Sequence, residues 1–499
     1  MSMYIGIDLG TSAMKLLLVK EDGAIVNSTT KEYPLRFPHP GWSEQDPSEW
    51  WGALLSGVTE LMNGFDVNEV CGIGVGGQMH GLVALDENDN VIRPAILWND
   101  GRTAEETEWL NTEIGKEKLS GYTGNIAFAG FTAPKILWMQ KHEPELFSRI
   151  AKIMLPKDYL NYRLVGVHAC DYSDASGMLL LDVEHKCWSK EMLAICGVRE
   201  SQMPNLFESY DVIGAVKKDV ANVLGIPASV QVVAGAGDNA AAAVGTGTVG
   251  NGACNISLGT SGTIFISSKT FGVDPLNGLH AFAHADGHWH LMGCMLSAAS
   301  CNKWFCEEIL KTTDFASEQI GMEANLGENR VFFLPYLMGE RSPINDVNAR
   351  GTFVGLSLDT TRRDIVQAVL EGVAFAIRDS FEVAKSIGVT IDRSKVCGGG
   401  AKSPVWRKML CNILNIPLDL PQTEQGPGYG GAMLAMVGTG LYANVKDCAD
   451  ALVQIKETIY PDPALAAKYE QRYQQFRRIY PSVKPLYKEF KEFQEEPLC

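Results

Sequence analysis

The tetrapeptide Leu-Gly-Thr-Ser occurs twice in the sequence, at residues 9–12 and 258–261, each time directly after an apolar run. A loop of this composition offers backbone N–H groups and two hydroxyls to one small volume, which suits the oxygens of a phosphate. A single copy would be interpreted as a tight hairpin turn. Two copies in the same context predict a polyphosphate that is held from both sides. The loop residues expected to bind it are Gly10, Thr11, Ser12, Gly259 and Thr260.

The two copies differ in the residue that precedes them, which is Asp8 in the first and Ser257 in the second. A carboxylate beside phosphates is a natural ligand for Mg²⁺. We therefore expect the metal on the N-terminal side, held by Asp8. Lys15, which ends the first motif, could reach a phosphate. The P-loop pattern GxxxxGK[ST] does not occur in the sequence, which excludes that class of nucleotide-binding protein.

Two further stretches predict a site for a small polar ligand. Residues 78–81 read QMHG, and the flanking glycines leave His80 accessible, although a lone histidine after a strand is usually structural. Residues 97–102 read LWNDGR, where Trp98 offers a flat apolar face. The hydrogen-bonding groups expected beside it come from Asn99, Asp100 and Arg102. Such a mixture is typical of sites for sugars or polyols.

Asp238 and Asn239 stand where an apolar strand ends and an alanine-rich helix begins. One interpretation is a helix cap. The other is a carboxylate that accepts the proton of a hydroxyl group during phosphoryl transfer. The local sequence supports both interpretations equally.

Three other patterns are interpreted as structural. The GxGxxG matches at 72–77 and 245–250 are each followed by an extended segment, whereas a dinucleotide-binding fold needs a helix there. Residues 284–290 read HADGHWH, and their Asp-Gly turn interrupts the alternation of the histidines. A hairpin is the better interpretation of that stretch than a metal site.

The same order of elements begins in each half of the chain. An apolar strand, the Leu-Gly-Thr-Ser loop and a second strand open both halves, and a glycine-rich segment at 245–252 separates them. Helical spacing follows at 48–63, with Ser48 as the expected cap, and again at 362–387. The 499 residues exceed what one hydrophobic core usually supports. We predict a duplicated α/β protein with domains at 1–248 and 249–499 and the site in the cleft between them.

The composition narrows the function further. A net charge of −16 argues against general binding to nucleic acid or to anionic membrane surfaces. No apolar run is long enough to span a bilayer, no signal peptide is recognisable, and the twelve cysteines include no CxxC pair. These features predict a cytoplasmic protein with reduced thiols. They leave open a homodimer.

Several motifs together resemble the FGGY family of carbohydrate kinases over essentially the whole chain. Residues 130–142 fit the first family pattern at Lys135 and Trp138, and residues 425–435 are similar to the second. Six further stretches are most similar to the members that phosphorylate xylulose: QMHG, PAILWNDGR, LPKDYL, AGAGDNAA, LSAAS and FLPYLMGERSP. The chain departs from relatives at Gly428-Tyr429 and near Lys303. Those departures concern the adenosine side of the site.

The resemblance implies two duplicated actin-like (ribonuclease H-like) domains, with ATP and a small sugar meeting in the cleft. It implies that Asp238 is the catalytic base and that Asp8 is the carboxylate associated with Mg²⁺. The residues that it places at the nucleotide phosphates are Thr11, Ser12, Lys15 and Thr260. The loop that it places beside adenosine is Gly399, Gly400 and Ala401. The sugar contacts that it implies are Met79, His80, Trp98, Asp238 and Asn239.

The expected reaction is the ATP-dependent phosphorylation of D-xylulose. Within the same class, a kinase for gluconate, ribulose or another ketose is the alternative. A non-catalytic, actin-like sugar sensor is a further alternative. The joint presence of Asp8, Lys15 and Asp238 argues against the sensor, which would not need all three.

Overall fold

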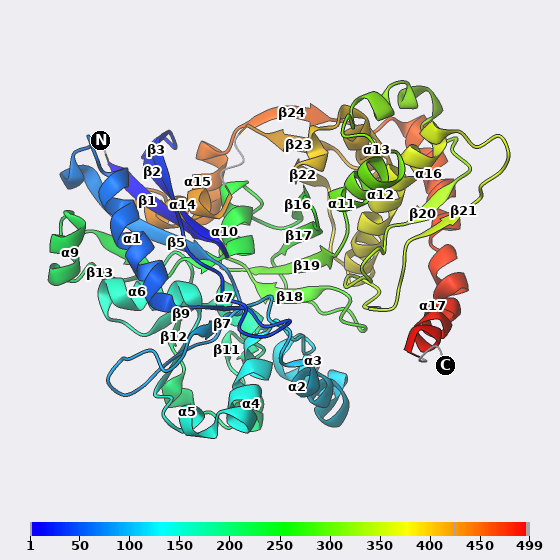
Figure 1. Cartoon of the computed structure of the whole chain (residues 1–499). Coiled ribbons are helices and arrows are strands. Elements are labelled where there is room, and N and C mark those ends of the chain that lie inside the picture. The colour runs from blue at the N-terminus through cyan, green and yellow to red at the C-terminus, as the bar shows by residue number, and fades with distance from the viewer. Residues whose placement is uncertain (1, 423–425, 496–499) are drawn as a thin grey trace.

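The computed structural model of the chain describes residues 2–422 and 426–495. Two lobes lie side by side, one formed largely by the N-terminal half and one by the C-terminal half (Figure 1). Each lobe is built on a seven-stranded mixed sheet. Gln425, the first residue of the stretch that is similar to the second family pattern, lies outside the described residues.

The N-terminal sheet has the strand order β13-β14-β5-β1-β2-β3, and β15 also pairs with β5. Its strands are β1 (Met3–Leu9), β2 (Ala13–Lys20), β3 (Ile25–Glu32), β5 (Val70–Gly77), β13 (Val212–Ala215), β14 (Gln231–Val233) and β15 (Ala236–Gly237). β1 is antiparallel to β2 and parallel to β5. The first Leu-Gly-Thr-Ser loop therefore joins two central strands.

The C-terminal sheet has the order β18-β19-β17-β16-β22-β23-β24. Its strands are β16 (Ala253–Leu258), β17 (Gly262–Ser268), β18 (His280–Ala283), β19 (Trp289–Met295), β22 (Arg393–Cys397), β23 (Leu418–Pro421) and β24 (Ile455–Ile459). β16 is antiparallel to β17 and parallel to β22, as β1 is to β2 and β5. The predicted repetition of strand, loop and strand is thus confirmed, and so is the hairpin predicted at 284–290, whose two strands are β18 and β19.

Short two-stranded pairings link the loops around the sheets. They involve β4 (Glu44–Gln45), β6 (Val83–Leu85), β7 (Ala95–Ile96), β8 (Lys152–Met154), β9 (Ala169–Asp171), β10 (Leu181–Asp182), β11 (Cys187–Trp188), β12 (Asn205–Phe207), β20 (Phe332–Leu334) and β21 (Thr352–Val354).

Helices cover both sheets. Those of the N-terminal half are α1 (Pro47–Leu61), α2 (Ala104–Trp109), α3 (Lys116–Thr123), α4 (Thr132–His142), α5 (Pro144–Ser148), α6 (Pro156–Val165), α7 (Tyr172–Ala175), α8 (Lys190–Ile195), α9 (Lys218–Leu224) and α10 (Asp238–Gly245). Those of the C-terminal half are α11 (Ala299–Trp304), α12 (Arg362–Ser386), α13 (Pro404–Leu414), α14 (Gly426–Gly438), α15 (Val445–Leu452), α16 (Pro463–Phe476) and α17 (Ile479–Glu495). No helix in the part of the chain that the structure describes is long and apolar enough to cross a membrane.

The helix predicted at 48–63 is present as α1, but Ser48 is not its cap. The cap is Asp46, whose side chain accepts a hydrogen bond from the Ser48 N–H, and Pro47 occupies the first helical position. Proline suits that position because it has no N–H to leave unsatisfied. The cap therefore lies two residues earlier than predicted.

The helix of the second family pattern, α14, packs on the N-terminal half of the chain. α14 lies against β1 and β5 of the N-terminal sheet and against α10, beside the blue strands in Figure 1. A Cβ added at Gly6 would lie 1.9 Å from the Gly428 carbonyl oxygen, and one at Gly74 would lie 2.0 Å from that of Gly431. One at Gly430 would lie 1.8 Å from the Ala241 carbonyl oxygen. Backbone thus meets backbone, which only glycine allows.

This packing explains the rejected GxGxxG match at 72–77. Its glycines lie in β5, where Gly72 and Gly74 make room for α14 and Gly77 makes room for Lys157 of α6, and they do not open a nucleotide-binding turn. The packing also means that α14, from the second half of the sequence, belongs to the core of the first sheet. The domain boundary at 248/249 stays a prediction.

We expect Gly430→Ala to lower the free energy of unfolding by at least about 2 kcal/mol, because overpacking against a backbone carbonyl cannot relax by a rotamer change. Gly52→Ala is the matched control. Gly52 lies inside α1 with nothing within 4 Å of an added Cβ, so the substitution should stabilise by about 0.5 kcal/mol. Urea denaturation of the two variants measures both effects. Equal stability of the two variants would contradict the backbone contact.

Candidate active site

The first Leu-Gly-Thr-Ser loop is held by a hydrogen bond of its own backbone and by bonds from two other segments of the chain. Within the loop the Gly10 N–H donates to the Ala13 carbonyl oxygen at 3.0 Å. The Gln45 side-chain amide donates to the Thr11 carbonyl oxygen, and the Gln78 N–H donates to the Leu9 carbonyl oxygen at 2.8 Å. Ser12 remains exposed. The loop is therefore rigid at its base and open at its tip, as a phosphate site requires.

Asp8 and Asp238 lie at the same edge of the N-terminal sheet. In the register of the sheet Asp8 pairs with Gly76 of β5, and Gly237 pairs with Gly77. Asp238 follows Gly237 directly as the first residue of α10. Because β1 and β15 are both parallel to β5, their carboxyl ends come together there. The structure thus brings together the two carboxylates that the sequence predicted for one site.

Both carboxyl groups are perturbed. Burial raises the pKa of Asp8 to about 6, against the opposing charge of Lys15. Burial raises the pKa of Asp238 to about 7, and the charge of Asp8 adds to that increase. Two acidic groups that repel each other at one edge suit a divalent cation. Within the described residues no group of three or more His, Cys, Asp or Glu side chains could hold a metal alone. Phosphate oxygens and water would have to complete its coordination.

Asp238 does not act as the N-cap of its helix. The N-cap is Gly237, and Asp238 Oδ1 accepts hydrogen bonds from the backbone N–H of Asn239 at 2.7 Å and from its side-chain amide at 2.9 Å. Oδ2 accepts none from the residues that the structure describes. One oxygen is therefore oriented by the protein and the other remains available to an incoming hydroxyl group.

His80 and Met79 lie beside these carboxylates. Met79 is buried, and its sulfur lies 3.9 Å from the side-chain nitrogen of Asn239. His80 Nδ1 lies 2.7 Å from the Gly177 carbonyl oxygen, and its ring stacks on Phe131 at 4.8 Å between centroids. Burial lowers the pKa of His80 to about 3, so the imidazole is neutral. Because a carbonyl only accepts, Nδ1 carries the proton and Nε2 is left as an acceptor.

Lys135, from the first family pattern, supports His80 rather than lining the site. Its buried ammonium group donates to the carbonyl oxygens of His80 at 2.8 Å and Gly130 at 2.7 Å. The Thr132 hydroxyl also donates to the His80 carbonyl oxygen, at 3.0 Å. His80 has a φ of 70°, a conformation that costs a non-glycine residue free energy. These donors hold the strained backbone in place. The sequence pattern identified Lys135 but not this role.

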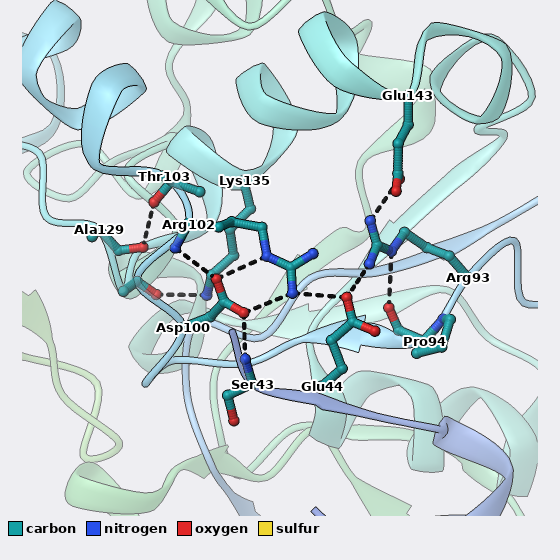
Figure 2. A network of polar contacts seen from close by, with 11 residues as sticks. Ser43, Glu44, Arg93, Pro94, Asp100, Arg102, Thr103, Ala129, Lys135 and Glu143 are labelled. Carbon is teal, nitrogen blue, oxygen red and sulfur yellow. Dashed lines mark hydrogen bonds and ion pairs between the residues drawn. The ribbon is translucent and has the colours of Figure 1, made fainter. Parts of the chain in front are cut away.

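The prediction that Asp100 and Arg102 bind the ligand is wrong, because both side chains are buried in an ion-pair network (Figure 2). Arg102 bonds both oxygens of Asp100, at 2.9 and 2.7 Å, and it lies 2.7 Å from a Glu44 oxygen. Its guanidinium group also lies 3.7 Å from the ring centroid of Trp42. The network fixes the loop that carries Trp98.

Trp98 itself is 47% exposed, and its indole N–H donates to the Thr11 hydroxyl at 2.9 Å. It therefore links the loop at 97–102 to the first phosphate loop. An exposed indole face beside the first phosphate loop is consistent with the predicted sugar contact.

His284 and Asp286 of the 284–290 stretch have structural partners. His284 Nε2 lies 2.9 Å from the Thr248 carbonyl oxygen, and Asp286 accepts a hydrogen bond from the Gly250 N–H at 2.8 Å. Both bonds hold the glycine-rich segment at 245–252, which joins the two halves. The hairpin interpretation is thus confirmed.

A cavity of about 820 Å³ opens beside the second Leu-Gly-Thr-Ser loop. Gly259, Thr260, Gly399 and Gly400 line it, as predicted, whereas Ala401 does not. Ala401 is buried beneath this surface, in the core of the C-terminal lobe. Lining residues that the sequence did not predict include Phe315, Ile320, Ser403 and Trp406, and Lys303 lines it as well. The volume and the largely apolar wall suit a nucleoside.

A second cavity, of about 290 Å³, lies between the two halves. Asn239 of α10 and Thr246, which follows that helix, line one side, and Ser257 and Gly398 of the C-terminal half line the other. One predicted sugar residue, Asn239, and the residue before the second phosphate loop, Ser257, therefore border a common space.

We expect Asp238→Asn to stabilise the protein in a pH-dependent way. The folded protein keeps a proton on Asp238 up to pH of about 7, whereas the unfolded chain loses it near the ordinary value of 3.8. The free energy of unfolding of the parent protein therefore falls as the pH rises across this interval. Because asparagine does not ionise, the Asp238→Asn variant does not lose this part of the free energy of unfolding.

The melting temperature of Asp238→Asn should accordingly exceed that of the parent at pH 8 and approach it at pH 4.5. Calorimetry at both pH values measures the difference. A constant difference at the two pH values would show that the carboxyl group is not perturbed as described.

The chain was compared with known proteins. Residues 3–245 match the N-terminal domain of the FGGY family of carbohydrate kinases, and residues 254–439 match its C-terminal domain. The chain is similar to a xylulose kinase from Escherichia coli (strain K12), with 42% identity over 97% of this chain and all of that protein. Among solved structures it is similar to a xyloylose kinase from Brucella ovis, with 40% identity, a TM-score of 0.91, and coverage of 97% of this chain and 100% of that one. It is also similar to a gluconate kinase from Lactobacillus acidophilus, with 27% identity, a TM-score of 0.92, and coverage of 98% and 99%. The chain therefore belongs to the FGGY family of carbohydrate kinases.

Proposed function

We propose that the protein transfers the terminal phosphoryl group of ATP to the 5-hydroxyl of D-xylulose, forming D-xylulose 5-phosphate in pentose catabolism. A family of carbohydrate kinases implies the use of ATP, typically with a divalent metal. The observation that carries the proposal is the pair of half-buried carboxyl groups with raised pKa values, Asp8 and Asp238, between a phosphate loop and a neutral histidine. The sugar is inferred from relatives that are named as xylulose kinases over their whole length.

In the proposed mechanism Asp238 is the general base. Its Oδ1 is held by Asn239. Its Oδ2 accepts the proton of the sugar hydroxyl group while the hydroxyl oxygen of the sugar attacks the phosphorus atom. A pKa near 7 matches a base that works near neutral pH. Transition states of phosphoryl transfer are loose, so positioning and charge neutralisation contribute more than covalent chemistry.

The remaining residues position the reactants. Thr11, Ser12 and Thr260 would bind phosphate oxygens from opposite sides, with Lys15 at the base of the first loop. Gly10 and Gly259 give those loops their close turns. Mg²⁺, held by Asp8 and phosphate oxygens, would neutralise the charge that develops on the transferred group. Met79, His80, Trp98 and Asn239 would orient the sugar, and Gly399 and Gly400 would border the adenosine. The cytoplasmic location and a homodimer remain predictions.

A kinase for another sugar is the alternative that one observation favours, because the gluconate kinase has the same fold at a TM-score of 0.92. Its lower identity, 27% against 42% for the xylulose kinase of Escherichia coli, supports xylulose over gluconate. Asp238 Oδ2, which accepts no hydrogen bond from the described residues, argues against a non-catalytic sensor, which would have no use for such a base.

A panel of sugars tests the proposal. We expect kcat/KM, measured by ADP release with ATP and Mg²⁺, to be highest for D-xylulose among xylulose, ribulose, gluconate and xylitol. Asp238→Asn, which keeps the helix contacts of the carboxyl oxygen, supplies the background rate. A higher kcat/KM for any other member of the panel would contradict the proposed substrate, and no sugar-dependent ADP release at all would favour the sensor.

The two phosphate loops differ in the residue that precedes them, Asp8 in one and Ser257 in the other, and this difference gives a second test. Asp8→Asn should raise the Mg²⁺ concentration needed for half-maximal activity by about tenfold or more, since a metal loses an anionic ligand. Ser257→Ala, the matched position beside the second loop, should change it by less than about twofold. Titration of activity with Mg²⁺ at fixed ATP measures both. Equal sensitivity of the two variants would place the metal elsewhere.

A further inference from the structure

Arg341 reaches from the C-terminal half toward the sugar side of the site. The segment that carries it is anchored to the end of β19: the Ser342 N–H donates to the Cys294 carbonyl oxygen at 3.0 Å. Glu340 Oε1 accepts the N–H groups of Leu296 at 2.9 Å and of Arg341 at 2.8 Å. The backbone of Arg341 is therefore held firmly against the C-terminal sheet.

The Arg341 side chain crosses to the N-terminal half. Its guanidinium carbon lies 5.3 Å from the ring centroid of Phe128. Phe128 in turn contacts Phe131, at 5.4 Å between centroids, and Phe131 stacks on His80. Arg341 thus lies on the aromatic cluster that holds the predicted sugar-contacting histidine.

Electrostatic interactions place Arg341 and Asp238 around the same thiol, that of Cys294. Burial raises the pKa of the half-buried Cys294 thiol; the charge of Arg341 and a hydrogen bond from it oppose that increase, and the charge of Asp238 adds to it. The positive charge of Arg341 also contributes to the low pKa of His80. Cys294 therefore has Arg341 and Asp238 as neighbours, and Arg341 has His80 as another.

Arg341 has no acidic partner in the described part of the chain: no carboxylate oxygen lies within 4.0 Å of its guanidinium nitrogens. The adjacent Glu340 uses Oε1 for backbone N–H groups. By contrast, Arg93 and Arg102 of the N-terminal half both form ion pairs with Glu44. A half-buried guanidinium group with five donors needs acceptor oxygens, which a sugar can supply.

We infer that Arg341 is a sugar-recognition residue, which donates hydrogen bonds to hydroxyl or carbonyl oxygens of the substrate from the C-terminal wall of the cleft. The inference rests on the proposed function and deepens it, because the family resemblance placed every sugar contact in the N-terminal half. A sugar held by Arg341 on one side and by Asn239 and His80 on the other would join the two halves directly.

The test compares Arg341→Met, Arg341→Lys and, as control, Arg330→Met, which removes an exposed arginine from the same half. Sugar affinity is measured by calorimetry without nucleotide, and KM is measured separately for sugar and for ATP. Losing a charged hydrogen-bond donor should raise both the sugar Kd and the sugar KM of Arg341→Met by about tenfold or more. The KM for ATP should change by less than about twofold. Arg341→Lys should fall between, and Arg330→Met should match the parent.

Two results would overturn the inference. One is an unchanged sugar Kd in Arg341→Met. The other is an equal rise of both KM values together with a lower melting temperature, which would mark Arg341 as a structural link to Phe128. Failure of the proposed substrate is distinguishable, because it appears in the parent protein as preference for another sugar. The same comparison is then made with that preferred sugar.

Discussion

Two carboxyl groups that cannot both ionise freely set the requirements for the rest of the structure. Asp8 and Asp238 are half-buried at one edge of a sheet, where burial disfavours the ionised form of both and the charge of Asp8 further disfavours ionisation of Asp238. Ionised carboxylates in such a place destabilise the fold unless a cation and a substrate share the site. The protein tolerates this arrangement because β1, β5 and β15 hold the backbone on which both residues stand. Strain and repulsion of this kind are typical of functional sites.

The position of α10 depends in turn on α14. Glycines at the contact let the backbone of α14 approach both the N-terminal sheet and α10, so Asp238 is placed by a helix from the other end of the chain. The same helix follows the strand β23 of the C-terminal sheet. Any relative movement of the two lobes would therefore act on the helix pair that positions the base.

The sequence predicted the parts of the site that are encoded locally. Asp8, the phosphate loops and Asp238 each follow an apolar strand directly, and strand ends that pair with a common neighbour meet in space. Asp100 and Arg102 were misinterpreted because their partners, Trp42, Glu44 and Trp138, are far away in the sequence. Ala401 was placed at the nucleotide through its neighbours, although its side chain points into the core. Arg341 was present in a quoted motif, but only the fold brings it next to Phe128 and Cys294.

The most direct test is a titration of the Asp238 carboxyl group by carbon-13 NMR, with aspartate labelled at the carboxyl carbon and the signal assigned through Asp238→Asn. The account predicts a pKa of about 7 in the protein alone, and a lower one when Mg²⁺ and a non-hydrolysable ATP analogue bind beside Asp8. An ordinary pKa near 4 in the protein alone, unchanged by metal and nucleotide, would contradict it.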